Sequence, residues 1–501
     1  MPVTRNFLGL DLGASSGRAV VGRFDGERLT LEEVHRFANG PVRLPTAKGS
    51  SIHWDSLDQF AQVKAGIAKA AECCGKERSQ ASGSLVSVGI DTWGVDYGLL
   101  DADGELLGNG YHYRDERTVG MPERVFEIIP REEVFHTTGI QFMDLNTLYQ
   151  LFAARGSAAL EKARRLLFTP DLMNYWLTGR AVNEYTIAST SQCLEPFSRS
   201  WAYDMIERLD IPTHIFGEIV QPGTVLGPLL PWVAEETGIE GIQLVTVGSH
   251  DTASAVAAVP VRGPDSAFVS SGTWSILGVE SPVPVVNDIA LAFNFTNEGG
   301  VCDTIRLMKN ITGLWLIQEC RRQWTKEGQR LTWDEIVDLA KAAPALRSII
   351  DVDDEAFIRP GDMPARIRNQ CERTGQAAPQ DKGAIARAVF ESIALKYRRV
   401  LDMTEQLTGK RAEALNIVGG GTQNRLLSQF AANAIGRPVI TGPIEATAVG
   451  NILMQMLAMG AVSSLAEGRE VVRRSFPVET FEPQDADRWN EAYQKLCEMA
   501  S

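Results

Sequence analysis

The segment 11–18 reads Asp-Leu-Gly-Ala-Ser-Ser-Gly-Arg and combines a carboxylate, a tight turn and two hydroxyl groups. Small residues let the backbone N–H groups of such a turn surround phosphate oxygens. Asp11 ends an apolar run just before the turn, where it could hold Mg²⁺ through water. The segment is therefore a candidate phosphate-binding turn. The alternative is a plain hairpin whose glycines only satisfy turn geometry.

Two later segments could contact the same kind of ligand. Ser270, Ser271, Gly272 and Thr273 offer a second turn of small residues and hydroxyl groups. Gly419, Gly420 and Gly421 follow an apolar run and precede a helical pattern, so that a flat adenine or ribose could approach the backbone without meeting a Cβ atom. Ser-Gly turns and glycine loops also occur for structural reasons alone, and that alternative remains open for both segments.

Asp251 is the candidate general base. It lies between His250 and Thr252 where an apolar run ends. An aspartate, with an ordinary pKa of about 3.9, is a weak base toward a sugar hydroxyl, but in phosphoryl transfer the proton becomes acidic as the oxygen bonds phosphorus. Correct placement of the carboxylate therefore matters more than its basicity. An aspartate that only caps the following helix is the alternative.

Further side chains could hold a sugar, because an aromatic ring covers its apolar face and charged groups bind its hydroxyls. They are Asp91, Trp93, Gly94, Asp96, Arg114, Asp115 and Arg117. A salt-bridged surface hairpin is the alternative for the last three. The sequence shows no histidine cluster for a catalytic metal, no G-x-S-x-G elbow and no G-x-x-x-x-G-K-[ST] loop. Any Mg²⁺ would therefore arrive with ATP.

The elements that must position these residues begin with a β-meander. Residues 6–12 and 18–24 alternate as two strands around the turn, and residues 29–35 can form a third. In dinucleotide-binding and P-loop folds the glycine turn opens a helix, whereas here the chain returns as a strand. The pattern argues against both of those folds.

A helix and a strand follow the meander. Asp55 is a good N-cap, and Leu57, Phe60, Val63 and Ile67 have the three- and four-residue spacing of one helix face. Residues 86–90 form a buried strand, after which a hairpin with its turn near residues 103–104 leads to residues 111–115. The first lobe is therefore predicted to be α/β.

A second lobe is predicted to start after the stretch 260–264, which resembles a hinge. Residues 244–258 run from a strand through His250 and Asp251 into a helical segment, and residues 267–279 resume a strand, turn, strand pattern. We place the lobes at 1–262 and 263–501, the first for sugar and phosphate and the second for ATP. Both open with a hairpin around a small-residue turn, which hints at a duplicated lobe. Later elements are helices at 383–407, 424–435, 446–459 and 486–499 and a strand at 415–418.

Composition limits the possible functions. A chain of 501 residues exceeds what one core usually organises, so two domains are expected. A net charge of −14 argues against nucleic acid or an anionic membrane as the main partner. No apolar run approaches a membrane span, the N-terminus lacks the features of a signal peptide, and seven scattered cysteines indicate buried thiols without disulfides. A cytoplasmic enzyme with a small ligand is expected.

Many segments together resemble the FGGY carbohydrate kinases of the actin and hexokinase-like superfamily, over nearly the whole chain. They are DLGASSGRAV from Asp11, SVGIDTWGVDY from Ser87, YRDERT from Tyr113, GIQFMDLNTLYQL from Gly139, SHDTASAVAAVP from Ser249, SSGTWSILG from Ser270, NEGG from Asn297, KNITGLWLIQ from Lys309 and IVGGGTQN from Ile417. The resemblance implies an α/β fold of two ribonuclease H-like lobes, as in the actin/hexokinase-like ATPases, around a central cleft.

The resemblance also implies roles for individual residues. ATP would be contacted by Ala14, Ser15, Ser16, Gly17, Arg18, Thr273, Gln318 and Gly420. The sugar would be contacted by Gly94, His250, Asp251, Thr252 and Asn310. Asp251 would accept the proton, and Mg²⁺ would be held with ATP near Asp11. Closure of the lobes would keep water from the γ-phosphate.

The expected reaction is ATP-dependent phosphorylation of a small ketose on its C1 hydroxyl, with L-rhamnulose as the specific expectation. L-Fuculose and L-xylulose are alternative substrates, because pocket stereochemistry is not legible from motifs. A non-catalytic nucleotide switch of the actin or Hsp70 kind shares the two-lobed core and is an alternative of another class. The expected partners are the ketose and ATP, with no nucleic acid and no membrane, for a monomer or homodimer.

Overall fold

The computed structural model describes residues 4–47, 49–75, 85–261, 263 and 266–499. The chain forms two compact units. The first contains Met1–Ala258, Glu280–Leu307 and Ala446–Phe476, and the second contains Val259–Val279, Met308–Glu445 and Pro477–Ser501. Neither unit is one continuous half of the chain. The stretch 260–264 lies partly outside the described residues, and the lobe boundary expected within it stays a prediction.

The first unit is built on a six-stranded sheet with the order β13-β14-β6-β1-β2-β3. Its strands are β1 (Arg5–Leu12), β2 (Ser16–Phe24), β3 (Leu29–Ala38), β6 (Leu85–Thr92), β13 (Val225–Pro228) and β14 (Gln243–Val245). β1, β2 and β3 pair antiparallel, while β6 joins β1 in parallel and β14 joins β6 in parallel. The β-meander and the buried strand that the sequence predicts are confirmed.

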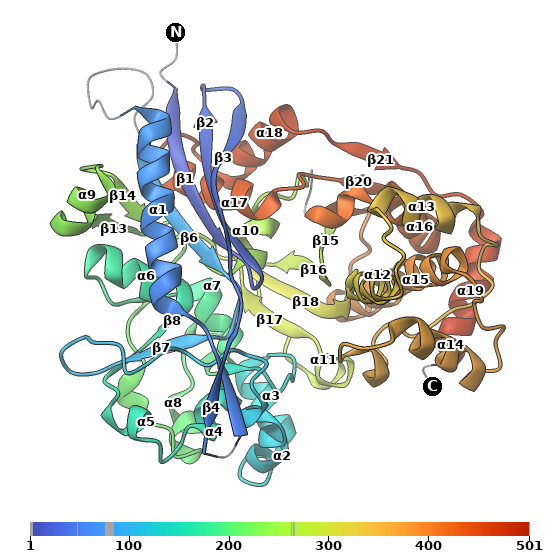
Figure 1. Cartoon of the computed structure of the whole chain (residues 1–501), viewed down its shortest axis with the longest axis horizontal. Coiled ribbons are helices and arrows are strands. Elements are labelled where there is room, and N and C mark those ends of the chain that lie inside the picture. Colours follow the sequence, from blue (N-terminus) through green and yellow to red (C-terminus); the bar gives the residue numbers. More distant parts are fainter. Residues whose placement is uncertain (1–3, 48, 76–84, 262, 264–265, 500–501) are drawn as a thin grey trace. The chain divides into compact units, whose positions relative to one another are not determined.

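One face of this sheet packs on helix α1 (Ser56–Cys74), which lies along β1, β2 and β3 in Figure 1. Leu10 of β1 and Ile90 of β6 share a core with Val63 and Ile67 of the helix. The Asp55 side chain caps α1 as predicted, accepting from the Asp58 backbone N–H at 3.1 Å. The expected apolar stripe is only partly buried, since 65% of Leu57 is exposed.

The opposite face packs on helix α17 (Ala446–Ala458), which comes from the far end of the chain. Gly89 of β6 lets this helix approach, because a Cβ atom there would lie 2.9 Å from Asn451 Oδ1 and 3.0 Å from Gln455 Nε2. Gln455 Nε2 in turn donates to the Leu8 carbonyl at 2.9 Å. Helix α10 (Asp251–Ala257) packs against α17 so closely that a Cβ atom at Gly450 would overlap the Ser254 carbonyl.

A long insertion separates β6 from β14. Its helices are α2 (Met121–Phe126), α3 (Arg131–Thr138), α4 (Thr147–Ala153), α5 (Ala158–Lys162), α6 (Thr169–Thr178), α7 (Tyr185–Ala188), α8 (Tyr203–Arg208) and α9 (Pro231–Thr237). Its strands are β7 (Tyr97–Leu100), β8 (Arg165–Phe168), β9 (Asn183–Glu184), β10 (Leu194–Glu195), β11 (Ser200–Trp201) and β12 (Ile219–Val220). The hairpin expected around residues 103–104 is present but short: Leu100 bridges Leu106, and the Leu107 N–H donates to the Leu99 carbonyl at 2.8 Å, while β7 takes β8 as its partner strand.

The first unit also holds the hairpin β4 (Val42–Thr46) and β5 (Gly49–His53), helix α11 (Asp288–Phe293), strand β17 (Thr296–Gly299) and helix α18 (Leu465–Ser475). A second sheet has seven strands in the order β17-β18-β16-β15-β19-β20-β21. Its further strands are β15 (Ser266–Ser271), β16 (Trp274–Ser281), β18 (Ile305–Thr312), β19 (Ala414–Val418), β20 (Val439–Thr441) and β21 (Glu479–Phe481).

The helices of the second unit are α12 (Trp315–Lys326), α13 (Trp333–Ala342), α14 (Met363–Arg373), α15 (Lys382–Thr408), α16 (Arg425–Ile435) and α19 (Ala486–Met499). The predicted helices at 383–407, 424–435, 446–459 and 486–499 are confirmed as α15, α16, α17 and α19. α15 begins at the Asp381 cap and ends at Gly409, whose φ of 67° is the left-handed conformation expected of a terminating glycine.

The two sheets repeat one topology. In the first, β1 pairs antiparallel with β2 and parallel with β6, β6 continues in parallel to β14, and β13 closes antiparallel. In the second, β15 pairs antiparallel with β16 and parallel with β19, β19 continues in parallel to β20, and β21 closes antiparallel. The repeat explains why both lobes open with similar hairpins, and it agrees with the expected pair of ribonuclease H-like lobes.

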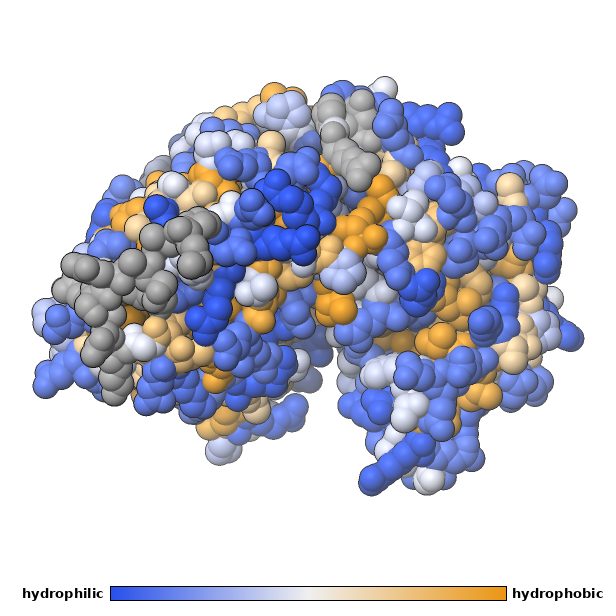
Figure 2. Space-filling model, turned by 90° about the horizontal axis from the view of Figure 1, so that it is seen from above, coloured by the Kyte–Doolittle hydropathy of each residue, from blue (hydrophilic) through white to orange (hydrophobic). Residues whose placement is uncertain are grey.

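The face in Figure 2 is mainly hydrophilic, with apolar residues in scattered patches. Within the described residues, no helix combines the length and the apolar character that crossing a membrane requires. None of the seven cysteines forms a disulfide bond there either.

The contact between α10 and α17 gives a test of the fold. Gly450→Ala should lower the free energy of unfolding by about 1–3 kcal/mol or more, because the new methyl group overlaps a backbone carbonyl that cannot rotate away. Gly40→Ala is the control, since a Cβ atom there meets nothing within 4 Å, and its effect should stay below about 1 kcal/mol. Urea denaturation of both variants measures the difference, and equal stabilities would contradict the close packing.

Candidate active site

Strand pairing brings Asp11, Arg18 and Asp91 to the same face of the first sheet. Asp11 lies opposite Arg18 on β2 and opposite Asp91 on β6. Arg18 donates from Nε at 2.9 Å and from Nη2 at 2.7 Å to Oδ2 of Asp11. Because β1 and β6 are parallel, both carboxylates lie at the carboxyl ends of their strands, where α/β folds place their ligands.

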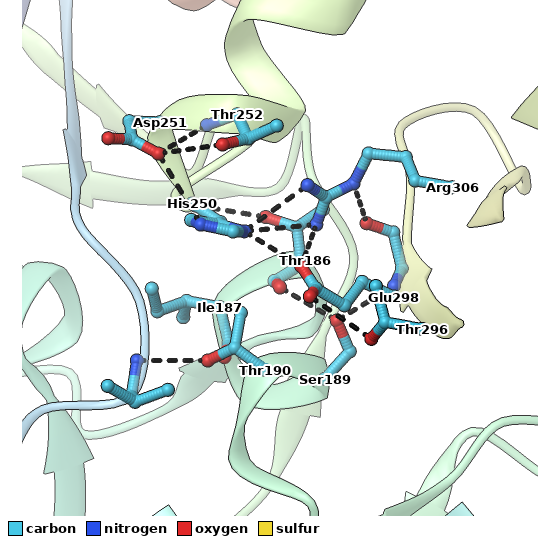
Figure 3. A network of polar contacts seen from close by, with 12 residues as sticks. Thr186, Ile187, Ser189, Thr190, His250, Asp251, Thr252, Thr296, Glu298 and Arg306 are labelled. Atoms are coloured by element: carbon cyan, nitrogen blue, oxygen red, sulfur yellow. Dashed lines mark hydrogen bonds and ion pairs between the residues drawn. The ribbon is translucent and has the colours of Figure 1, made fainter. Parts of the chain in front are cut away.

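Asp251 is the third carboxylate of the same region. The Thr92 backbone N–H donates to the Ser249 carbonyl at 2.9 Å, which ties the segment before Asp251 to the end of β6. Asp251 Oδ1 accepts from the Thr252 backbone N–H at 2.5 Å and from Thr252 Oγ1 at 3.1 Å (Figure 3). No hydrogen bond or ion pair to Oδ2 is seen in the described part of the chain, and 34% of the side chain is exposed. One oxygen is therefore anchored and the other is open to a ligand.

The helix-capping alternative for Asp251 is not what the structure shows. Asp251 is the first residue of α10, and the N-cap position belongs to His250, whose side chain makes no capping hydrogen bond. Among the described residues, the one helical N–H that the Asp251 side chain binds is that of Thr252. The carboxylate is thus fixed at the N-terminus of α10 through Oδ1, and Oδ2 takes no part in these hydrogen bonds.

Burial and neighbouring charges raise the proton affinity of two of these carboxylates, Asp91 and Asp251. Burial raises the pKa of Asp91 well above its ordinary value, and the Asp11 and Asp251 carboxylates add to the rise. Removal from water also raises the pKa of Asp251, with a further contribution from Asp11 and an opposing one from His250. Such like-charged groups are stabilised by a cation.

The residues present fit a magnesium ion whose other ligands are water and phosphate oxygens. Asp91 Oδ1 is buried and has no hydrogen-bond partner among the described residues, while Arg18 contacts only Oδ2 of Asp11 in the hydrogen bonds above. In the described residues no three His, Cys, Asp or Glu side chains are arranged to hold a metal ion directly. Mg²⁺ in phosphoryl-transfer sites is commonly held by one or two carboxylates, water and phosphate oxygens, which such a site could supply.

Two residues that the sequence did not suggest fix the backbone before Asp251. Glu184 Oε2 accepts from the Ser249 N–H, and Thr186 Oγ1 accepts from the His250 N–H, both at 3.2 Å. Glu184 also caps α7, accepting from the Thr186 and Ile187 N–H groups. Burial raises the pKa of Glu184 to about 7. The sequence around Glu184, Val-Asn-Glu-Tyr-Thr-Ile at 182–187, carries no pattern that predicts this role.

The aromatic segment near Gly94 differs from the prediction. Asp96 is not a sugar ligand, because its Oδ2 accepts from Trp54 Nε1 at 2.6 Å, Trp93 Nε1 at 3.0 Å and the Tyr113 N–H at 3.1 Å. Its Oδ1 accepts from Gln150 at 2.8 Å. The two indole rings lie 3.9 Å apart with only 2% and 6% of their residues exposed. Asp96 is thus the hub of a buried aromatic cluster.

This cluster still borders the region of Asp251. Burial raises the pKa of Tyr113, and the Asp96 and Asp251 carboxylates both add to the rise. Gly94 packs against Thr190, whose Oγ1 accepts from the Val95 N–H at 3.0 Å. The aromatic cluster therefore lies beside the candidate base, and Gly94 lies in the segment between β6 and β7.

The contacts of Asp115 and Arg117 differ from the salt-bridged hairpin considered for residues 114–117. Asp115 is buried and accepts from the Ile52 and Arg117 backbone N–H groups at 2.7 and 3.0 Å. Arg117 donates to Gln150 at 2.9 Å and stacks on the Tyr111 ring at 3.8 Å. Arg114 lies 5.5 Å from the Tyr113 ring. These residues therefore pack around the aromatic cluster.

The turn 13–15 joins β1 and β2 as the sequence predicts. The Gly13 N–H donates to the Ser16 carbonyl at 3.0 Å, and Asn39 Nδ2 donates to the Gly13 carbonyl at 2.7 Å. Gly17 is required by packing, because a Cβ atom there would overlap the Phe37 ring. Ala14 and Ser15 lie in the turn, while Ser16, Gly17 and Arg18 begin β2.

In the second unit the structure brings three predicted nucleotide contacts into one neighbourhood. Thr273 Oγ1 donates to Gln318 Oε1 at 3.3 Å, and the Trp315 N–H donates to the Thr273 carbonyl at 3.1 Å. Gly419 and Gly421 pack on Ser271, where a Cβ atom would collide, whereas Gly420 faces open space. Only the middle glycine is therefore available to a ligand. Asn310, which the sequence predicts as a sugar contact, lies on β18, the sheet neighbour of β16.

Comparison with known proteins identifies the family. The description "FGGY family of carbohydrate kinases" applies to two matching models, one of the N-terminal domain over residues 6–258 and one of the C-terminal domain over residues 267–459. The chain belongs to the FGGY family of carbohydrate kinases. The resemblance of the sequence motifs to this family is thereby confirmed.

Individual relatives of this FGGY kinase are close over their whole length. The chain is 43% identical to the rhamnulokinase of Bacteroides thetaiotaomicron, covering 98% of each, and 39% identical to that of Oceanobacillus iheyensis, covering 95% of this chain and 97% of the relative. It resembles the solved gluconate kinase and xylulose kinase of Lactobacillus acidophilus, with TM-scores of 0.80 and 0.81, both at 17% identity and covering 99% of this chain and 97% of theirs. These structures show the shared two-domain kinase fold.

The aromatic hub gives a test of the site's framework. Asp96→Asn should cost about 2–4 kcal/mol of unfolding free energy, because the new amide group faces donors and leaves them unsatisfied. Tryptophan fluorescence should shift together with the lower midpoint of urea denaturation. Asp288→Asn, whose side chain is 93% exposed, is the control and should stay within about 0.5 kcal/mol. A stable Asp96→Asn variant would remove Asp96 from this role.

Proposed function

We propose that this FGGY kinase transfers the γ-phosphoryl group of ATP to the C1 hydroxyl of L-rhamnulose, giving L-rhamnulose 1-phosphate, with Asp251 as the general base. The observation that carries the proposal is the arrangement of Asp251, with one anchored and one open oxygen beside Asp11 and Asp91. The names of the full-length relatives support L-rhamnulose as the acceptor.

The open oxygen of Asp251 can accept the hydroxyl proton as the new O–P bond forms. The pKa of this carboxyl is raised by its surroundings, so the proton is held more firmly than by an aspartate in water. The sugar oxygen becomes acidic only as it bonds phosphorus, and placement of the base therefore contributes most. His250, Thr252, Gly94 and Asn310 are the remaining proposed sugar contacts.

The phosphate groups need positive charge and backbone donors. Arg18, held by Asp11, and the turn of Ala14, Ser15, Ser16 and Gly17 are proposed to contact ATP, as are Thr273, Gln318 and Gly420 of the second unit. Mg²⁺ held with ATP near Asp11 would offset charge on the transferring group. We further propose a cytoplasmic enzyme of L-rhamnose breakdown that works as a monomer or homodimer.

The test is Mg²⁺-dependent ADP release from the purified protein with L-rhamnulose, L-fuculose, L-xylulose and glycerol. L-Rhamnulose should stimulate release most strongly. Stronger stimulation by another ketose would support the proposed mechanism and assign that ketose as the substrate. ATP binding without stimulation by any sugar would favour the nucleotide-switch alternative.

The same assay tests the base. Asp251→Asn should lower kcat by roughly 100- to 10,000-fold, because the amide cannot accept the proton, while ATP binding stays within about threefold. Asp288→Asn serves as the control on the exposed surface. Turnover close to wild type in the Asp251→Asn enzyme would remove this residue from the mechanism.

A further inference from the structure

A buried tyrosine lies beside the hairpin turn 271–275, which joins β15 to β16 in the second unit. Ser271 and Ser275 are opposite each other at the two ends of this turn, and both are buried. The Tyr397 hydroxyl, which comes from the interior of helix α15, lies 2.7 Å from Ser275 Oγ and 3.5 Å from Ser271 Oγ. The first distance is that of a good hydrogen bond between hydroxyl groups, and the second is that of a weak one. A single hydroxyl of α15 therefore contacts both ends of the turn.

The hairpin turn carries Thr273, one of the proposed ATP contacts. The Leu314 N–H donates to the Gly272 carbonyl and the Trp315 N–H donates to the Thr273 carbonyl, both at 3.1 Å. The start of α12 thus fixes the main chain at the tip of the turn. Tyr397 acts at another place, because it binds the side chains at the two ends of the turn.

The glycine turn 419–421 packs on one of these two serines. A Cβ atom at Gly421 would overlap Ser271 Oγ, and a Cβ atom at Gly419 would lie 2.9 Å from the Ser271 carbonyl oxygen. Gly420, between them, faces open space and is another proposed ATP contact. Because Ser271 belongs to the hairpin turn and contacts the glycine turn, it links the two turns that are proposed to bind ATP.

The hydroxyl group of Tyr397, and not its ring, makes the contacts with the serines. Tyr397 has no exposed surface, so its hydroxyl depends on partners inside the protein. Burial raises the pKa of Tyr397, and the hydroxyl therefore keeps its proton. It can donate to one serine while it accepts from the other. A phenylalanine would fill the same space and leave the serines without this partner.

We propose that Tyr397 is a positioning residue for nucleotide binding: its hydroxyl fixes the two serines, so that the hairpin turn and the glycine turn keep the spacing that ATP needs. This inference rests on the proposed contacts of Thr273 and Gly420 with ATP. Tyr397 is completely buried and acts on the nucleotide only through these two turns. Its loss should weaken nucleotide binding and leave the sugar contacts around Asp251 unchanged.

Tyr397→Phe removes the hydroxyl and keeps the ring. Calorimetric titration should show ADP binding weakened roughly 5- to 30-fold, because the serine side chains lose the partner that fixes them. In the kinase assay the KM for ATP should rise by a similar factor, while kcat and the KM for L-rhamnulose stay within about twofold of wild type. A tyrosine that only stabilised the fold would lower the midpoint of urea denaturation without this split. Unchanged ADP binding in the folded variant would overturn the proposal.

Tyr149→Phe is the matched control. Tyr149 lies in α4 of the first unit and is also completely buried, but its hydroxyl has no hydrogen-bond partner among the described residues. Its removal should leave ADP binding, kcat and both KM values as in wild type. Equal losses of ADP binding in Tyr149→Phe and Tyr397→Phe would show a general effect of removing a buried hydroxyl and would overturn the proposal.

Ser275→Ala tests the path of the effect, and it replaces Tyr397→Phe if that variant does not fold. It should weaken ADP binding to a similar extent. In its background Tyr397→Phe should change ADP binding by less than about twofold more, because the two hydroxyls form one contact. Effects that multiply in the double variant would overturn the proposal, as would unchanged ADP binding in Ser275→Ala.

Direct measurement of ADP binding separates this inference from the proposed function. A wild type that binds ADP without phosphorylating any sugar would refute the proposed reaction. The ratio of the ADP affinities of Tyr397→Phe and Tyr149→Phe would still decide the role of Tyr397. A wild type that binds no ADP would overturn both, because the two turns would then have no nucleotide to bind.

Discussion

Repulsion among Asp11, Asp91 and Asp251 is the constraint on which the site depends. Parallel pairing of β1 with β6 places the first two at neighbouring strand ends, and the bond from the Thr92 N–H to the Ser249 carbonyl brings the third to them. Their mutual effect and their burial raise the pKa of Asp91 and of Asp251. A protein can keep such groups together only if neighbours compensate for them, as Arg18 and Asn451 do, or if a bound cation does so.

The side chains that offset the negative charge of these carboxylates come from both ends of the chain. Asn451 Nδ2 donates to Asp91 Oδ2 at 2.6 Å, and Gln455 Nε2 donates to Asn451 Oδ1 at 2.7 Å. These residues lie on α17, more than three hundred residues after β6. Helix α17 therefore completes the first unit beside the carboxylate cluster, and Gly89 and Gly450 make room for it.

Much of this arrangement could be predicted from local patterns. The meander, the long helices and their caps follow from alternation, periodicity and terminal residues such as Asp381 and Gly409. Asp251 and the turn 11–18 could be identified because polar residues interrupt apolar runs there. Partner choice over long distances was not legible: nothing near Tyr97 indicates that β7 pairs with β8, and nothing near Asn451 indicates that it binds Asp91. The same limit made Asp96 resemble a sugar ligand, because its buried indole partners come from separate segments.

The claim that this carboxylate cluster is built for a cation bound with nucleotide has a direct test. Calorimetric titration of ADP with and without Mg²⁺ should show that Mg²⁺ strengthens binding to the wild type. In Asp11→Asn that strengthening should fall roughly tenfold or more, while metal-free binding stays the same or improves because one negative charge is gone. An equal effect of Mg²⁺ on wild type and Asp11→Asn would contradict the account.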